Sequence, residues 1–153
     1  MHINRAKLIT VESMRFSSKS SAMIGIFSAV HAVLYIVSPD GLWRSWSIYV
    51  EPIEGIILGP RIGFLSALMG SIIARVIKPT PDWMFGIAAE PIGVLACGLI
   101  VKQKWKYLLG LNAIMLVAYF AHPFGRWLPL WAILDILAAP ILIFPVIKLF
   151  RSR

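Results

Sequence analysis

Six long apolar runs occupy most of this 153-residue chain and restrict its fold more than any other feature. Charged and turn-forming residues divide the runs at about 21–38, 48–60, 61–78, 83–101, 106–121 and 127–149. A helix that crosses the hydrocarbon core of a bilayer needs about 20 residues. The first, fourth and sixth runs have this length, whereas the fifth is short and the second is short enough to be re-entrant.

The composition argues that lipid covers these runs. Only 14% of the residues are charged, against about a quarter in a typical soluble domain. A soluble domain of this size leaves roughly 30% of its unfolded-chain surface in water, and this chain has too few polar residues to cover it. We therefore predict an all-α integral membrane protein, a bundle of six short transmembrane helices. A basic segment at residues 1–19 precedes this single transmembrane domain at residues 20–150.

The fifteen lysines and arginines predict the orientation of the bundle. If the N-terminus is cytoplasmic, eleven of them fall on the cytoplasmic side of the six spans and four on the outer side. The outer four are Arg44, Arg75, Lys78 and Arg126. This bias matches the positive-inside rule, so we expect both termini in the cytoplasm and a multi-pass protein of the cell membrane. Because the basic residues lie between apolar runs and no recognition motif accompanies them, we expect no nucleic-acid partner.

Ionisable side chains gather at one predicted depth within the spans. Each costs about 2.5–3.5 kcal/mol at a helix centre, so each needs a partner or a role. At about 1.5 Å per residue from the outer end of its run, Glu51 lies roughly 5 Å deep and four others lie roughly 9–12 Å deep. Those four are His31, Glu54, Glu90 and Asp135. Residues from four helices are therefore expected to meet at one level.

Other polar and aromatic residues approach the same level. Arg75 and Tyr119 lie near the outer ends of the third and fifth runs, and tryptophans concentrate at the predicted outer boundary. The tryptophans that we assign to the site are Trp43, Trp46 and Trp131. Together with the ionisable residues, they predict a polar substrate pocket in the outer half of the bundle, roofed by tryptophans.

Two prolines stand directly after acids of this pocket, in Glu51-Pro52 and Glu90-Pro91. A proline inside a helix frees a backbone carbonyl, which membrane proteins tolerate where it faces protein or a water-filled cavity. Transporters bind solutes at such interrupted segments. An acidic pocket with aromatic faces favours a cationic or amphipathic heteroaromatic solute. The alternative is that Arg75 and Glu90 form a structural ion pair that closes the bundle.

Small residues recur every four positions in two of the runs. The first run carries Ser21, Gly25 and Ala29, and the third carries two such stripes, at 63, 67 and 71 and at 66, 70 and 74. Such stripes let helices approach closely, either within the bundle or against an external partner. The chain has no ATP-binding motif, so uphill transport driven by ATP would need another subunit.

Two stretches carry a resemblance to a known family. They are SSAMIGIFSAVHAVLYIVS at 20–38 and EPIEGIILGPRIGFLSALMGSIIARVI at 51–77, followed by the proline- and glycine-bearing fourth run. This part resembles the substrate-binding S components of energy-coupling-factor vitamin transporters, although the chain is shorter than usual.

The resemblance implies a six-helix subunit that captures a micronutrient from outside. It further implies docking onto a transmembrane coupling subunit driven by ATPases, through Ser21, Gly25 and Ala29 of the first helix. Thiamine-binding members are similar in using tryptophan and carboxylate for a cationic ring, which favours a thiamine-like solute. On this interpretation the chain is not an enzyme, has no catalytic residue, and holds no cofactor or resident metal.

Three other functions remain possible from the residues alone. The first is a metal-uptake subunit that uses His2, His31, His122 and the carboxylates. The second is a membrane-embedded enzyme with Glu90 or Asp135 as the general acid or base, although no nucleophile or cofactor motif accompanies them. The third is a non-catalytic assembly subunit in which the acids are purely structural.

Overall fold

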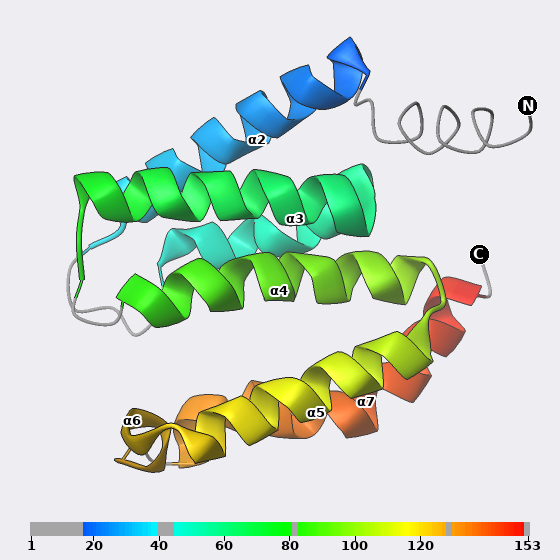
Figure 1. The fold of residues 1–153 in the computed structure, drawn as a ribbon. Helices are drawn as coiled ribbons and strands as arrows, with labels where there is room; N and C mark the ends of the chain where they lie inside the picture. Colours follow the sequence, from blue (N-terminus) through cyan, green and yellow to red (C-terminus); the bar gives the residue numbers. More distant parts are fainter. Residues whose placement is uncertain (1–16, 40–44, 81–82, 128–129, 152–153) are drawn as a thin grey trace, which may run out of the picture.

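A computed structural model describes residues 17–39, 45–80, 83–127 and 130–151, and this part of the chain is helical with no strand. The predicted all-α class is confirmed, with six α-helices in the described residues (Figure 1). They are α2 (Ser18–Val37), α3 (Glu51–Ile77), α4 (Trp83–Val101), α5 (Trp105–Ala121), α6 (Pro123–Trp127) and α7 (Leu134–Arg151). Two 3₁₀ helices, η1 (Trp46–Tyr49) and η2 (Leu130–Ile133), precede α3 and α7.

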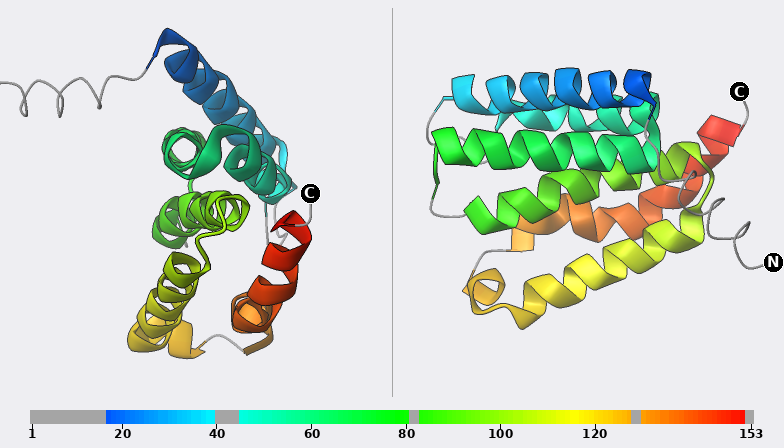
Figure 2. Two further views of the ribbon diagram at one scale, coloured as in Figure 1. Left: turned by 90° about the vertical axis from the view of Figure 1, so that its right-hand side faces the viewer. Right: turned by 45° about the horizontal axis from the view of Figure 1, so that its top comes forward.

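The second and third predicted runs form two helical arms that share the label α3 and meet at a kink, where the chain folds back. Gly59 has φ 75° and ψ 175°, a conformation that glycine adopts readily, and Pro60 then starts a second arm. A Cβ added to Gly63 would lie 2.9 Å from the carbonyl oxygen of Glu54, whereas residues nine apart in a straight helix are separated by about 13 Å. The arms at 51–58 and 60–77 are therefore antiparallel (Figure 2).

The first arm of α3 is short, with about 12 Å of helix at 1.5 Å per residue. This length is well below the thickness of the hydrocarbon core, and η1 extends the segment toward the loop after α2. Pro52 lies at the start of this arm, where its missing N–H has no helical partner to lose. The expectation that Pro52 interrupts a span is therefore wrong, whereas Pro91 does lie inside α4.

Small residues hold α2, both arms of α3 and α4 close together. A Cβ added to Gly70 would lie 2.8 Å from both the Cβ of His31 and the carbonyl oxygen of Ser28 on α2. A Cβ added to Gly98 of α4 would lie 2.6 Å from the backbone nitrogen of Pro60. Both stripes of α3 are buried, so they serve packing within the bundle. The stripe of α2 behaves differently, because Ser21, Gly25 and Ala29 are all exposed.

Helices α5 and α7 form a second unit, which lies beside α4 (Figures 1 and 2). The buried side chain of Asn112 donates a hydrogen bond from Nδ2 to the carbonyl oxygen of Ile136, at 3.0 Å. Pro140 lacks the N–H that would otherwise bond this carbonyl within α7, so Asn112 both joins the two helices and satisfies the freed group. The side chain of Gln103 donates to the carbonyl oxygen of Ile147, at 3.3 Å.

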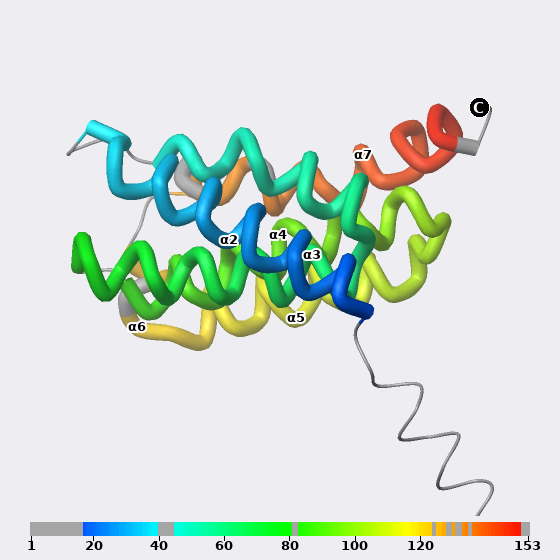
Figure 3. Tube along the Cα trace, turned by 90° about the horizontal axis from the view of Figure 1, so that it is seen from above, coloured from blue at the N-terminus to red at the C-terminus, as the bar shows by residue number. Residues whose placement is uncertain are grey.

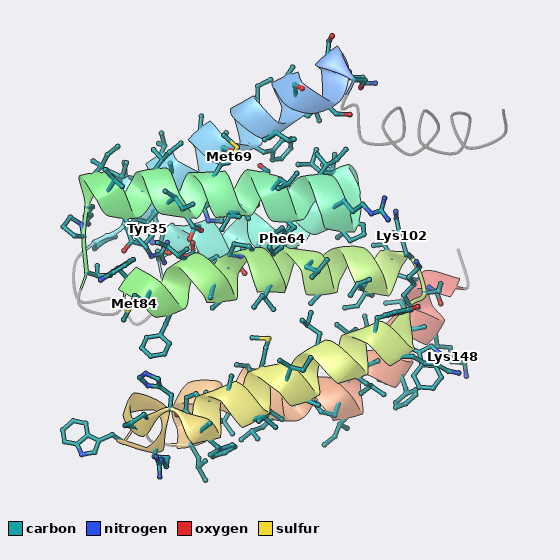
Figure 4. The ribbon with its side chains drawn as sticks, in the orientation of Figure 1. Tyr35, Phe64, Met69, Met84, Lys102 and Lys148 are labelled. Carbon is teal, nitrogen blue, oxygen red and sulfur yellow. The ribbon has the colours of Figure 1, made fainter. Side chains whose placement is uncertain are left out.

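The two ends of the bundle differ in charge. Lys102 and Lys148 lie at the same end as the start of α2 and the end of α7, whereas Tyr35 and Met84 lie toward the opposite end (Figures 3 and 4). A Cβ added to Gly59 would lie 3.8 Å from Cε of Lys102, which places the fold of α3 at the lysine end. We refer to the opposite end as the Tyr35 end.

The surface is apolar. Within the described part of the chain, α2, α3 and α4 are long and apolar enough to cross a membrane, and α5 and residues 136–150 are apolar but shorter. Val76, Val117 and Ile141 have 78%, 69% and 76% of their surface exposed. Extended exposed apolar patches are rare on soluble monomers. These features are those of a protein that associates with a membrane.

The contact at Gly70 yields a first prediction. We expect Gly70→Val to lower the melting temperature of the detergent-solubilised protein, because overpacking typically costs about 1–3 kcal/mol. Gly110→Val is the matched control on α5, since a Cβ there meets nothing within 4 Å. Thermal unfolding of both variants in one detergent measures the difference, and equal melting temperatures would contradict the packing described for Gly70.

Candidate functional site

Four predicted site residues meet where α2, α3 and α4 pack together. His31 comes from α2, Glu54 from the first arm of α3, Arg75 from its second arm, and Glu90 from α4. His31 and Glu54 have no exposed surface, and Arg75 and Glu90 are also buried. We call these four residues the charged cluster. Their meeting agrees with the single depth that the sequence predicted.

Arg75 and Glu90 form a bidentate ion pair. Nη1 of Arg75 donates to Oε2 of Glu90 at 2.9 Å, and Nη2 donates to Oε1 at 2.8 Å. The guanidinium carbon also lies 4.5 Å from the ring centroid of Tyr35. This parallel geometry is among the strongest that arginine makes with a carboxylate. The structural ion pair weighed from the sequence is therefore present.

Small residues complete the surroundings of this ion pair. The hydroxyl of Ser71 donates to Oε2 of Glu90, and the hydroxyl of Ser47 donates to Oε1 at 3.3 Å. A Cβ added to Gly86 would collide with the guanidinium of Arg75, so this glycine makes room for the pair. Sequence reasoning missed Tyr35, Ser47 and Gly86, because nothing in their spacing marks them as neighbours of the acids.

His31 lies between two carboxylates. Its Nδ1 is 3.3 Å from Oε2 of Glu54, and its Nε2 is 3.0 Å from Oε2 of Glu90. Oε1 of Glu54 is buried and has no hydrogen-bond partner in the described structure. The imidazole thus connects the first arm of α3 to α4 through α2, and the charged groups compensate one another away from water.

A cavity of about 680 Å³ adjoins one side of the charged cluster. Arg75 and Glu90 line it, together with Glu51 and Lys78, and its other walls come mainly from α4, α5 and α7. A Cβ added to Gly93 would lie 2.6 Å from Oε2 of Glu51, so this glycine accommodates the carboxylate. His31 and Glu54 are not among the lining residues; they lie behind the ion pair and hold it in place.

The other predicted site residues lie elsewhere or outside the described structure. Trp46 on η1 is 42% exposed and does not line the cavity. Tyr119 on α5 packs edge-on against Phe120, and it does not line the cavity either. Trp43 and the side chains of Trp131 and Asp135 lie outside the described residues.

His31 contacts Glu54 and Glu90, but no group of three side chains placed to hold a metal ion is found in the part of the chain that the structure describes. His122 instead packs edge-on against Phe85 of α4, with ring centroids 5.1 Å apart. His2 lies outside the described residues. The geometry thus gives no support to the metal-uptake interpretation.

Comparison of the chain with protein-family models, curated proteins and solved structures finds no match. The function is therefore inferred from the chemistry of the cavity and the charged cluster.

The ion pair yields a second prediction. Removing one partner of a buried pair costs about 3–5 kcal/mol, because the other charge is left uncompensated. We expect Glu90→Gln and Arg75→Gln each to lower the melting temperature in detergent strongly. The double variant should lose less than the sum of the single losses, and strictly additive losses would show that the two residues do not stabilise the bundle as a pair.

Proposed function

We propose that this chain is a membrane-embedded substrate-capture subunit of an uptake transporter in the cell membrane. It binds a small water-soluble micronutrient in the cavity beside the charged cluster and relies on a separate ATP-driven coupling module. The observation that carries the proposal is a cavity of about 680 Å³, with charged groups at one end, inside a small apolar bundle. Binding sites for small molecules commonly have 300–1,000 Å³ and a few polar groups in a mostly apolar wall.

The distribution of basic residues supports an outward-facing site. Arg61, Lys102 and Lys148 belong to the end where α3 folds back, and the positive-inside rule assigns such an end to the cytoplasm. The charged cluster then lies in the outer half of a six-span bundle with both termini in the cytoplasm. A solute can reach this position from outside without crossing the apolar core.

The lining residues support a heteroaromatic or cationic solute, with a thiamine-like compound favoured. Glu51 and Glu90 offer carboxylate oxygens, and Tyr35 and Phe85 offer aromatic faces on the same cavity. Aromatic rings attract cations, especially desolvated ones. Glu51 also lines the cavity, and we propose that its carboxylate contacts the solute.

The exposed face of α2 supports docking onto a transmembrane coupling subunit. Ser21, Gly25 and Ala29 lie on this face, and a Cβ added to Gly25 meets nothing within 4 Å. The neighbouring face of α2 carries Ser28 and His31, which pack against α3. A helix with small residues toward the lipid can receive a partner helix at close range.

A non-catalytic assembly subunit is the second candidate, and the ion pair is the observation that favours it. Arg75, His31, Ser47 and Ser71 all bond Glu90, so protein groups satisfy this carboxylate without a ligand. The same contacts leave Glu90 poorly placed for general acid or base catalysis, and we propose no enzymatic activity. A rise in melting temperature on adding a solute is expected of a capture subunit and not of an assembly subunit, so this measurement distinguishes the two candidates.

Ligand binding is the third prediction. A solute that binds the folded state stabilises it by about 2.7 kcal/mol at a hundredfold excess over its Kd. We expect one compound in a panel of vitamins, vitamin precursors and nucleobases, with divalent metals included, to raise the melting temperature. Glu51→Gln should reduce this shift, whereas Lys102→Gln at the other end should leave it unchanged. A complete panel without any shift would contradict the capture of a compact solute.

Partner docking is the fourth prediction. We expect the wild-type chain, purified from its native membrane, to retain a transmembrane partner with ATPase subunits, and Gly25→Leu to lose them because leucine separates the helices. Gly110→Leu on α5 is the matched control, since its position is equally open. Equal retention by both variants would contradict docking through this face of α2.

A further inference from the structure

The cavity is elongated, and one face of α4 lines it almost from end to end. Phe85, Ala89, Gly93, Ala96 and Ile100 all contribute to its wall. Their spacing of three to four residues keeps them on a single face of the helix. At 1.5 Å per residue, the stretch from Phe85 to Ile100 measures about 22 Å. The cavity is therefore a long seam that runs with the helices toward the lysine end.

The far part of the seam is apolar. Its walls from α5 include Leu108, Leu111 and Met115, and those from α7 include Ile143 and Val146. Asn112 is the polar side chain that α5 and α7 contribute among the described lining residues, and its amide donates to the carbonyl oxygen of Ile136. This part of the seam thus offers little to a polar solute.

The charged side chains among the described lining residues, in contrast, lie toward the Tyr35 end. They are two carboxylates and two cations, Glu51, Glu90, Arg75 and Lys78. Ser38 and Thr80 add hydroxyl groups at the same end. Arg75 pairs with Glu90, and Nζ of Lys78 donates to the carbonyl oxygens of Ile36 and Ser38, at 3.3 and 2.7 Å. Charges of both signs, each with a protein partner, therefore border this end of the cavity, and a head group that carries both charges can contact them without leaving one sign unmatched.

We infer that the captured substrate is an amphiphile, with a zwitterionic head at the charged end and a hydrocarbon tail in the seam between α4, α5 and α7. This inference rests on the proposed capture function and replaces its compact, thiamine-like solute with an amphiphilic one. A compact micronutrient would fill only the charged end and leave apolar wall uncovered. A tail in the seam buries apolar surface on three helices, and each methylene that it buries adds to affinity.

The test uses acylcarnitines as probes, because they combine one zwitterionic head with tails of different length. The protein is placed in phosphatidylcholine nanodiscs, and binding is measured for carnitine and its acetyl, octanoyl and dodecanoyl esters. The octanoyl ester has six more methylenes than the acetyl ester, and burial of about two of them suffices for a tenfold gain. We therefore expect the octanoyl ester to bind at least about tenfold more tightly. Each probe partitions into the nanodisc lipid to the same extent whichever variant is present. A difference in probe binding between variants therefore reports on binding in the seam.

Two alanine variants of α4 provide the matched pair. Ala96 lines the middle of the seam, whereas Ala88 is exposed and does not line it. We expect Ala96→Phe to abolish the gain from the longer tail, with a much larger loss for the octanoyl ester than for carnitine, and Ala88→Phe to behave as wild type. A tail gain that survives in Ala96→Phe, or no gain in the wild type, would overturn the inference.

The outcomes also separate this inference from the capture function. If a compact solute from the vitamin panel stabilises the protein but tail length has no effect, capture stands and the amphiphile inference fails. If neither compact solutes nor acylcarnitines bind, both fail. The source of the amphiphile is tested by adding lysophosphatidylcholine to the nanodisc: displacement of the octanoyl probe indicates a membrane lipid, and retention indicates a water-soluble substrate.

Discussion

The arrangement of α2, α3 and α4 depends on the buried ion pair between Arg75 and Glu90. Two charges within an apolar bundle are tolerated only when each is matched, and the bidentate contact provides this match at 2.8 and 2.9 Å. The pair also fixes the rotation of its helices, because both oxygens of Glu90 must face α3. His31 and Glu54 extend the constraint to α2 and to the first arm of α3.

Glycine makes this electrostatic arrangement possible. Gly70 brings α3 against the Cβ of His31, and Gly86 leaves space for the guanidinium of Arg75. Gly59 turns the chain back between the two arms of α3, so that Glu54 and Arg75 reach the same cluster from antiparallel arms. A larger side chain at the two contact positions would separate the groups whose mutual attraction offsets their desolvation.

The sequence predicted which residues share a level along the helices better than it predicted which way their side chains point. Counting residues along each run placed His31, Glu54 and Glu90 at one level, and they do meet. Depth alone does not specify which way a side chain points around its helix. Tyr119 was predicted at a similar level, but it packs against Phe120 and not against the charged cluster. The rotation depends on tertiary contacts such as those of Gly70 and Gly86, which leave no periodic signal.

The boundaries of α4 followed from local chemistry, because α4 begins and ends where the fourth apolar run does. The prediction of one span at 127–149 was wrong, since this run holds the end of α6, then η2, and only from Leu134 the helix α7. The break at Gly59 and Pro60 was likewise visible as a turn signal between two runs. The seam between α4 and the α5–α7 unit was not predictable, because it depends on how closely two packed units approach. The residues of its apolar wall have the same composition as the exposed faces of the helices, so the sequence does not distinguish the two.

Structural and binding roles for the charged cluster do not exclude one another. An ion pair used only for packing gains nothing from bordering a cavity, and apolar side chains of similar volume often hold a bundle at least as well. Arg75 and Glu90 form a buried pair and also line a cavity of about 680 Å³. Behind them, His31 and Glu54 are fully buried and hold the pair without reaching the cavity. This division into supporting and lining residues is the arrangement that a preorganised binding site requires.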